Sequence, residues 1–314
     1  MNTNLLFWVI FVIMVGAMLY IDLYVTDHEK HEKTIKSSAI WSLIWISVAL
    51  AFNASLYLFY DNGHEKAMEF LAGYLIEKSL SVDNLFVFIM IFQALNIKRI
   101  NQPHILKWGI LSAIVFRIAF IFLGVNLIKH FEATIYVFGA ILLYAAYKML
   151  MDAFSEEEQV MDLEKNYIMN YLSRHFRIDR AYHGKKFFTK IGGKTALTPL
   201  FIALVIIETS DIVFAVDSIP AVLAITQDPF IVITSNIMAI LGLRALYFVL
   251  SGMLKYFKYL KHGVAFILFF VGVKMMIAHF YKIPVSVSLM VIFLTLVLSV
   301  GVSLLTMKKQ KPGA

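Results

Sequence analysis

The sequence predicts an all-α, polytopic membrane protein. Hydrophobic residues make up 60% of the 314 residues and charged residues only 16%, and the mean hydropathy is +0.77. A soluble domain typically has about 25% charged residues. The apolar residues also come in runs of about 20, the helix length that spans a bilayer. These runs lack the alternation of a β-barrel strand, which excludes that class of membrane protein.

Nine apolar runs predict nine transmembrane helices. They cover Leu5–Leu23, Ala39–Phe59, Ala67–Leu95, Ile105–Ile128, Ala133–Met151, Ala196–Ile225, Phe230–Met253, Gly263–Phe280 and Pro284–Met307. The first run has no basic leader and no small-residue cleavage pattern, so we expect it to be retained rather than removed as a signal peptide.

The basic residues predict how the chain is oriented. One set of loops carries twenty Lys and Arg residues, whereas the opposite set carries only Lys66, Lys129 and Lys282. The positive-inside rule places the richer set in the cytoplasm. The amino terminus is then outside and the carboxyl terminus cytoplasmic. This placement also accounts for the net charge of +7, so nucleic acid is not an expected partner.

The sequence between Asp152 and Lys194 is the one sizeable soluble element. Ser155 and Glu158 form a capping box, which predicts the start of a helix. Apolar residues then recur at helical spacing, at Val160, Leu163, Tyr167 and Tyr171. We predict an amphipathic helix on the membrane surface, followed by a basic loop.

Two segments of the chain resemble each other. Leu80 to Asn84 aligns with Phe214 to Ser218, and an acid precedes each aspartate by six residues. The following spans carry Arg117 and Arg244 in matching settings, and the third spans carry Lys148 and Lys274. The two copies start on opposite sides of the membrane, which predicts an inverted 3+3 repeat with a site near the midplane. The predicted units are two N-terminal helices (1–60), repeat 1 (67–151), a cytoplasmic segment (152–195), repeat 2 (196–282) and a last helix with a tail (284–314).

Five acids lie inside the apolar runs. An ionised acid at this depth costs at least about 2.5–3.5 kcal/mol, so these acids require partners. Serine, threonine and asparagine surround them, and the chain has no cysteine. Carboxylate, hydroxyl and carbonyl oxygens suit hard cations such as Mn²⁺, Mg²⁺ and Ca²⁺. The five acids are Glu77, Asp83, Glu208, Asp211 and Asp217.

The surroundings of these acids allow further expectations. Pro220 predicts a break in the sixth span beside Asp217, which would free backbone carbonyls for the site. The two deep arginines, Arg117 and Arg244, are expected charge partners of the acids. Purely structural ion pairing is the alternative to an ion site. The lone polar residues, Asn53, Asn126, Asn236 and Asp22, fit interhelical hydrogen bonds better than metal ligation.

The stretches from Glu77 to Asn84 and from Glu208 to Ala221 resemble the signatures of the TerC family of integral membrane proteins, and the layout is similar to the Alx branch of that family. The resemblance implies a bacterial cytoplasmic-membrane protein, related to LysE-type transporters, that exports manganese and is linked to tellurite, metal and alkaline-pH stress. It also implies the metal-handling residues, which are Glu77, Asp83, Asn84, Glu208, Asp211 and Asp217.

These observations lead to the expectation of Mn²⁺ export by alternating access. No nucleotide-binding loop is present, so proton exchange is the expected drive. Calcium or magnesium transport remains open, as does a membrane scaffold or assembly factor in stress response. The sequence has no His-Glu zinc motif and no nucleophile–base pair, so neither an enzyme nor a resident cofactor is expected. The sequence does not predict an oligomeric state.

Overall fold

The computed structural model describes residues 3–25, 35–131, 133–154, 167–179, 184–191, 193–253, 259–281 and 283–309. Most of them form α-helices, with a short π-helix, η1 (Ile21–Val25), after the first. The helices are α1 (Thr3–Tyr20), α2 (Ile35–Phe59), α3 (Gly63–Ala94), α4 (Gln102–His130), α5 (Thr134–Phe154), α6 (Tyr167–His175), α7 (Pro199–Leu223), α8 (Pro229–Ile240), α9 (Leu243–Met253), α10 (Leu260–Ile277) and α11 (Val285–Lys309).

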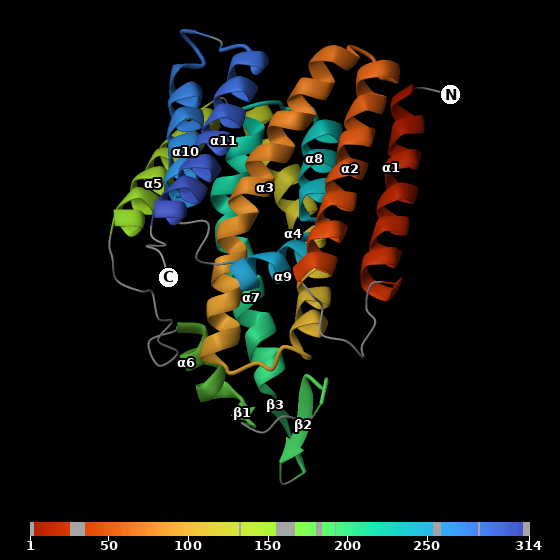
Figure 1. The fold of residues 1–314 in the computed structure, drawn as a ribbon, viewed down its shortest axis with the longest axis vertical. Coiled ribbons are helices and arrows are strands. Elements are labelled where there is room, and N and C mark those ends of the chain that lie inside the picture. Colours follow the sequence, from red (N-terminus) through yellow and green to blue (C-terminus); the bar gives the residue numbers. More distant parts are fainter. Residues whose placement is uncertain are drawn as a thin grey trace.

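The structure confirms the predicted fold class. Seven helices within the described residues are long and apolar enough to cross a membrane, or eight if the bent pair α8–α9 is counted as one span. Helix α3 does not pass that test, although it has 32 residues and runs the full height of the helical bundle (Figure 1). It carries two charged pairs and two further acids, which lower its mean hydropathy: Glu65, Lys66, Glu69, Glu77, Lys78 and Asp83. The count of nine spans therefore stays a prediction.

The predicted break at Pro220 is wrong. Helix α7 runs without interruption to Leu223, with Pro220 inside it. Pro220 lies in the last helical turn, where the loss of one backbone hydrogen bond disturbs little of the helix. The break occurs instead between α8 and α9, which meet at an angle of 43°. Gly242 lies there with a φ of +81°, a conformation that glycine adopts without steric cost.

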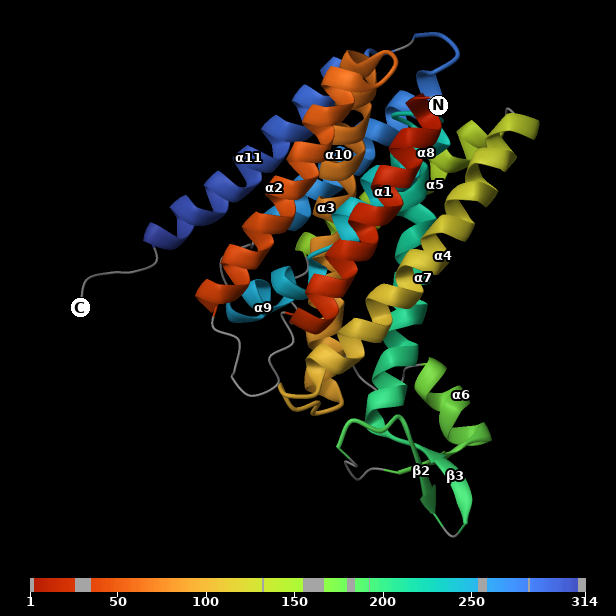
Figure 2. The ribbon, with the colours of Figure 1, turned by 90° about the vertical axis from the view of Figure 1, so that its right-hand side faces the viewer.

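Helices α3 and α7 lie at the centre of the molecule and pack against each other. Helix α8 packs on α3, helix α4 packs on α7, and α5 packs on α10. Helices α1 and α2 lie on one side of this group, and α5, α10 and α11 on the other (Figure 1). In the turned view α1 and α2 face the reader (Figure 2). A two-fold axis between α3 and α7 would exchange the pair α3–α8 with the pair α7–α4, and would exchange α5 with α10. The inverted repeat stays a prediction.

Small residues allow helices α5 and α10 to cross closely. A methyl group at Gly139 would lie 3.3 Å from the carbonyl oxygen of Gly272, and one at Gly272 would lie 3.2 Å from that of Gly139. Backbones that approach this closely pack well in a bilayer, where hydrophobic association between helices is absent.

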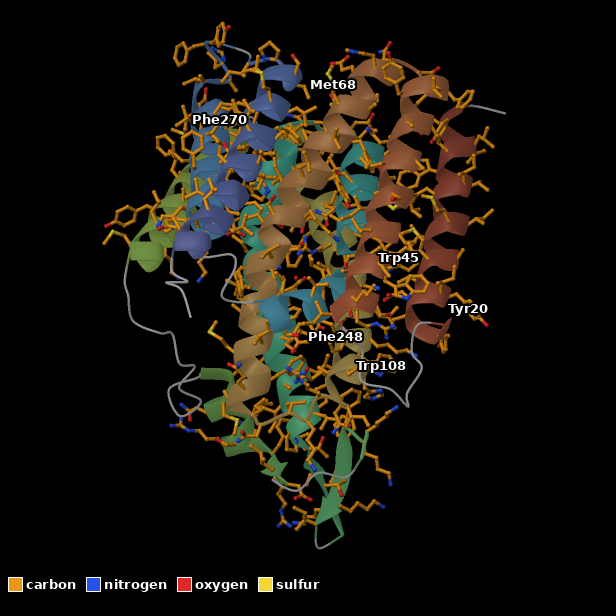
Figure 3. All side chains as sticks on the ribbon, in the orientation of Figure 1. Tyr20, Trp45, Met68, Trp108, Phe248 and Phe270 are labelled. Carbon is orange, nitrogen blue, oxygen red and sulfur yellow. The ribbon has the colours of Figure 1, made fainter. Side chains whose placement is uncertain are left out.

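The outer surface of the bundle is apolar, as a bilayer requires. Large hydrophobic side chains are exposed along the outer helices, among them Ile13 on α1, Leu58 on α2 and Leu298 on α11. In Figure 3 the exposed aromatics Tyr20 and Trp108 lie in the lower half of the bundle, toward the same end as the strands. Aromatic rings favour the membrane–water interface.

The soluble element differs from its prediction. Residues 155–166, which hold the predicted capping box, lie outside the described residues, and α6 contains the last two apolar positions of the predicted helix. The predicted loop instead forms a three-stranded sheet, in the order β1 (Arg177–Ile178), β3 (Lys194–Leu197), β2 (Phe188–Ile191). Strands β2 and β3 are antiparallel, and the sequence between them is Gly192-Gly193, a hairpin signal in the sequence itself.

Candidate functional site

Arg117 is the centre of a buried polar network between four helices. Its guanidinium is 1% exposed and forms an ion pair with Glu77 of α3, which is fully buried. It also binds Asp211 of α7 through two contacts, Nη2 to Oδ1 at 3.1 Å and Nε to Oδ2 at 3.4 Å. Nη1 donates to Oδ1 of Asn236 on α8 at 3.3 Å. The guanidinium thus joins both halves of the predicted repeat.

Two amide side chains complete the network. Asn236 Nδ2 donates to Glu77 Oε2 at 2.9 Å, and Asn84 Nδ2 donates to Asp211 Oδ1 at 3.3 Å. Glu77 and Asn84 are seven residues apart on α3, about two helical turns, so they share one face of the helix. That face packs against α7 and α8. Each carboxylate therefore has a cationic and an amide partner.

The network presents oxygen to a single positive charge. Four acceptor atoms contact the guanidinium: one oxygen of Glu77, one of Asn236 and both of Asp211. Carboxylate and amide oxygens are the ligands that hard cations take. Two buried carboxylates with one guanidinium leave a formal charge of −1. The arrangement can therefore hold a cation, and in this structure that cation is the side chain of Arg117.

Glu208 lies outside this network. It is on α7, three residues before Asp211, and both of its carboxylate oxygens are buried without a hydrogen-bond partner in the described part of the chain. Ser112 lies beside it on α4, but the Ser112 hydroxyl donates to the carbonyl oxygen of Trp108 at 2.7 Å. A buried carboxylate in this position is costly.

Asp217 is also separate from the network, although it lies within electrostatic reach of Glu77 and Arg117. It lines an open pocket of about 330 Å³ between α3, α5 and α7, together with Lys148 and Lys261. The side chain of Asp83 lies outside the described residues. Of the six predicted metal-handling residues, the structure thus brings together Glu77, Asn84 and Asp211.

No ready-made acidic metal cluster is present among the described residues. No group of three or more His, Asp or Glu side chains there lies in a position to hold a metal ion. The four predicted acids whose side chains are described are divided between the Arg117 network, Glu208 and the Asp217 pocket. The predicted ligand set therefore stays a prediction.

Arg244 does not reach the acid site, in contrast to the expectation that it would. It forms an ion pair with Asp22 of η1, Nε to Oδ2 at 3.4 Å, and also donates to the Asp22 backbone oxygen. Asp22 is separated from Arg244 by more than 200 residues, and no local pattern indicates the contact. Lys274 is likewise buried and donates to Ser288 on α11 at 3.0 Å.

The interhelical hydrogen bond predicted for Asn236 is confirmed, since Asn236 bonds to Glu77 on α3 and Arg117 on α4. The sequence analysis did not place this residue in the site, because an uncharged side chain in an apolar run resembles an ordinary interhelical contact. Its position in the sequence Thr234-Ser235-Asn236 was the available signal, since all three are fully buried polar residues. Thr234 and Ser235 bond to carbonyls of their own helix, which leaves Asn236 to bond across to α3 and α4.

Lys78, next to Glu77, binds the end of α8 at the break. Its Nζ donates to the carbonyl oxygens of Ala239 at 3.0 Å and Leu241 at 3.4 Å. A cation at a helix carboxyl end satisfies carbonyls that have no partner within the helix. Lys78→Met is expected to lower the free energy of unfolding by about 1–2 kcal/mol.

Thermal unfolding of the purified protein in detergent measures this effect of Lys78→Met. Lys148→Met is the matched control, because Lys148 is exposed near the end of α5. We expect the control to change the free energy of unfolding by about 0.5 kcal/mol or less. Equal stability of the two variants would contradict the role of Lys78.

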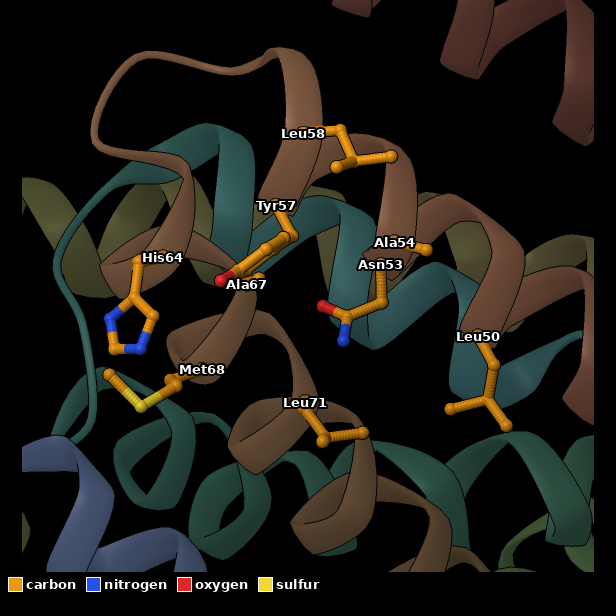
Figure 4. Close-up of a pocket in the computed structure, with 9 residues that line it drawn as sticks. All are labelled: Leu50, Asn53, Ala54, Tyr57, Leu58, His64, Ala67, Met68 and Leu71. Atoms are coloured by element: carbon orange, nitrogen blue, oxygen red, sulfur yellow. The ribbon is translucent and has the colours of Figure 1, made fainter.

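A second hollow, of about 410 Å³, lies between α2 and α3 (Figure 4). Asn53, His64 and Met68 line it together with apolar side chains, and it contains no acid. It therefore lacks the negative charge that a cation site requires.

Comparisons with known proteins agree with this membrane architecture. Residues 62–311 match the model of the family described as "Integral membrane protein TerC family". The chain is 44% identical over 301 residues to a protein of Escherichia coli strain K12 named "Putative membrane-bound redox modulator Alx", covering 94% of this chain and 92% of that protein.

Two further relatives carry no functional name. The chain is 45% identical over 285 residues to "Uncharacterized membrane protein STKORF319" of Myxococcus xanthus, covering 91% of this chain and 88% of the relative. It is 39% identical over 298 residues to an "Uncharacterized membrane protein" of Rickettsia felis, covering 95% and 97%. No solved structure matches the chain. The family match covers most of the chain, and the chain therefore belongs to the TerC family of integral membrane proteins.

Proposed function

We propose that this protein exports Mn²⁺ across the bacterial cytoplasmic membrane, through a site formed by Glu77, Asp211 and Asn236. The observation that carries the proposal is the buried oxygen cluster contributed by α3, α7 and α8, which already surrounds a positive charge. The ion would take oxygen ligands in place of its water shell, as hard divalent ions do. Asp217 lines an open pocket next to this cluster and marks a path for the ion.

The energetics favour exchange against protons. Moving two positive charges outward against an inside-negative potential costs about 4.6 kcal/mol per 100 mV. Inward movement of protons offsets that cost. The name of the Escherichia coli relative refers to redox modulation. This chain has no cysteine, so a link to redox balance would run through metal supply rather than through thiols.

Ion flux into proteoliposomes tests the proposal. With Mn²⁺ on one side and a metal-sensitive dye on the other, wild type is expected to move the ion, with an accompanying pH change inside. Glu77→Gln and Asp211→Asn are each expected to reduce the flux by about tenfold or more. Glu65→Gln is the matched control, because Glu65 is an exposed acid on the same helix. Parallel runs with Ca²⁺ and Mg²⁺ rank the three ions.

A membrane scaffold is the competing function. If the acids served only assembly, their neutralisation would lower the amount of protein in the membrane without changing the flux per molecule. Absence of flux of all three ions in wild type would reject transport of a hard divalent cation.

A further inference from the structure

Two unequal sites for the same guanidinium lie side by side in this structure. Arg117 is fully engaged with Glu77, Asp211 and Asn236. One helical turn away on α7, Glu208 is a buried carboxylate with no hydrogen-bond partner within the described residues. In the first site, Arg117 occupies the position where an incoming ion would have to bind. In the second site, the described residues provide no cationic partner for the carboxylate of Glu208.

Glu208 lies one helical turn from Asp211, the α7 carboxylate that Arg117 contacts. Helices α4 and α7 run parallel, because Gly109 lies beside Glu208 and Gly124 lies beside Leu223. A helical side chain slopes toward the amino terminus of its helix, so Arg117 leans toward Ser112 and Gly109. Glu208 and Asp211 share a face of α7 and are about 4.5 Å apart along its axis. An exchange of partners between Asp211 and Glu208 would move the guanidinium along α7 by about this distance.

Space beside Glu208 is kept open by a small residue on α4. A methyl group at Gly109 would lie 3.4 Å from Glu208 Oε1, so a larger side chain there would press on the carboxylate. The Ser112 hydroxyl lies beside Glu208, and it donates to the backbone oxygens of Trp108 and Gly109 on its own helix. Within the described residues both carboxylate oxygens of Glu208 are therefore left without a hydrogen-bond donor.

We propose that Arg117 is an exchanging internal cation, which leaves Glu77 and Asp211 for Glu208 when the transported ion binds. This inference rests on the proposed function and deepens it. In the ion-free state Arg117 closes the site. In the ion-bound state every charge of this set remains paired, because the ion faces Glu77 and Asp211 while Arg117 faces Glu208.

The exchange also accounts for a preference for divalent ions. Three carboxylates and one guanidinium carry a formal charge of −2, which one divalent ion cancels and a monovalent ion does not. Residual charge is costly in a low-dielectric interior. Glu208 is therefore assigned as the second partner of Arg117 rather than as a metal ligand.

Binding of Mn²⁺ to the full chain in detergent, measured by calorimetry, tests the exchange through a double-mutant cycle. Glu208→Gln is expected to weaken binding by about tenfold or more, since Arg117 then has no carboxylate to move to. Arg117→Gln removes the competing cation, and is expected to tighten binding. In the Arg117→Gln background, Glu208→Gln is expected to change binding by about threefold or less.

The cycle separates the alternatives. If Glu208 is a metal ligand, its loss weakens binding by the same factor in both backgrounds, which overturns the proposal. If Glu208→Gln leaves Mn²⁺ binding unchanged in the wild-type background, the proposal is overturned as well. If Arg117→Gln does not fold, Arg117→Lys replaces it. Lysine keeps the positive charge but cannot make both guanidinium contacts with Asp211. Mn²⁺ binding is then expected to tighten, and Glu208→Gln is expected to weaken it by a smaller factor than in wild type. If Glu208→Gln weakens Mn²⁺ binding by the same factor in the Arg117→Lys background as in wild type, the exchange is rejected. Absence of Mn²⁺ flux by wild type in proteoliposomes would instead reject the proposed function.

Discussion

Neutralising both carboxylates that pair with Arg117, together with Glu208, is expected to destabilise the protein by about 3–5 kcal/mol, because the variant Glu77→Gln/Glu208→Gln/Asp211→Asn leaves a buried guanidinium without an ion-pair partner. In the wild-type structure Arg117 is 1% exposed and its ion pairs are with Glu77 and Asp211. Unfolding of the purified protein in detergent, by heat or denaturant, measures the loss.

The same variant allows a rescue. Adding Arg117→Gln removes the uncompensated charge, and amide side chains can still hydrogen-bond to one another. Replacement of a whole buried ion-pair set by neutral groups is often close to neutral in stability. The quadruple variant is therefore expected to recover most of the lost free energy of unfolding.

Exposed acids provide the control for this charge change. Asp61→Asn/Glu65→Gln neutralises two acids at the start of α3, and both are exposed. We expect a change of about 0.5 kcal/mol or less for this pair. If the triple variant is as stable as the control, Arg117 does not depend on these carboxylates. If Arg117→Gln fails to rescue it, the loss comes from altered packing rather than from charge.

The sequence allowed much of this site to be predicted, because charge in an apolar run is a strong signal. The bilayer penalty singles out Glu77, Asp211 and Arg117 in the sequence, and the resemblance between the two segments indicates that α3 and α7 come together. The pairing partners were harder to predict. Arg117 and Arg244 occupy matching positions, yet only Arg117 meets the acids, since Arg244 is held by Asp22 from η1. That contact depends on how α1 and α2 pack, and no local spacing encodes it.

The position of the helix break shows the same limit. Proline removes a hydrogen-bond donor wherever it stands, but the effect depends on its distance from the helix end. Pro220 lies one turn before the end of α7, so the helix tolerates it. Glycine weakens a helix by about 1 kcal/mol, which does not by itself end a helix in the middle of an apolar run. Tertiary contacts determine the break at Gly242, because α2 approaches the chain closely there and Lys78 donates to the carbonyl oxygens at the end of α8.

Gly242→Ala is therefore expected to destabilise the protein by about 2–5 kcal/mol. A left-handed conformation costs a residue with a Cβ about 1–2 kcal/mol, and forced overpacking costs about 1–3 kcal/mol. The added methyl group would lie 2.5 Å from Cδ1 and 2.9 Å from Cβ of Trp45 on α2. The Trp45 Cβ is fixed to the backbone, so the side chain cannot move away freely.

Gly301→Ala is the matched control, because no heavy atom lies within 4 Å of a methyl group there and the residue is inside α11. Its stability is expected to stay equal or to rise by about 0.5–1 kcal/mol through better helix propensity.

The consequence of Gly242→Ala reaches the site through α8. Asn236 lies in the second-to-last turn of that helix, and Lys78, which binds its end, is adjacent to Glu77. A shift of α2 or α8 that relieves the clash would move Asn236 relative to Glu77. Under the proposed function, Mn²⁺ binding is then expected to weaken together with stability. A Gly242→Ala variant as stable as Gly301→Ala, measured in the same detergent, would show that the break does not depend on glycine.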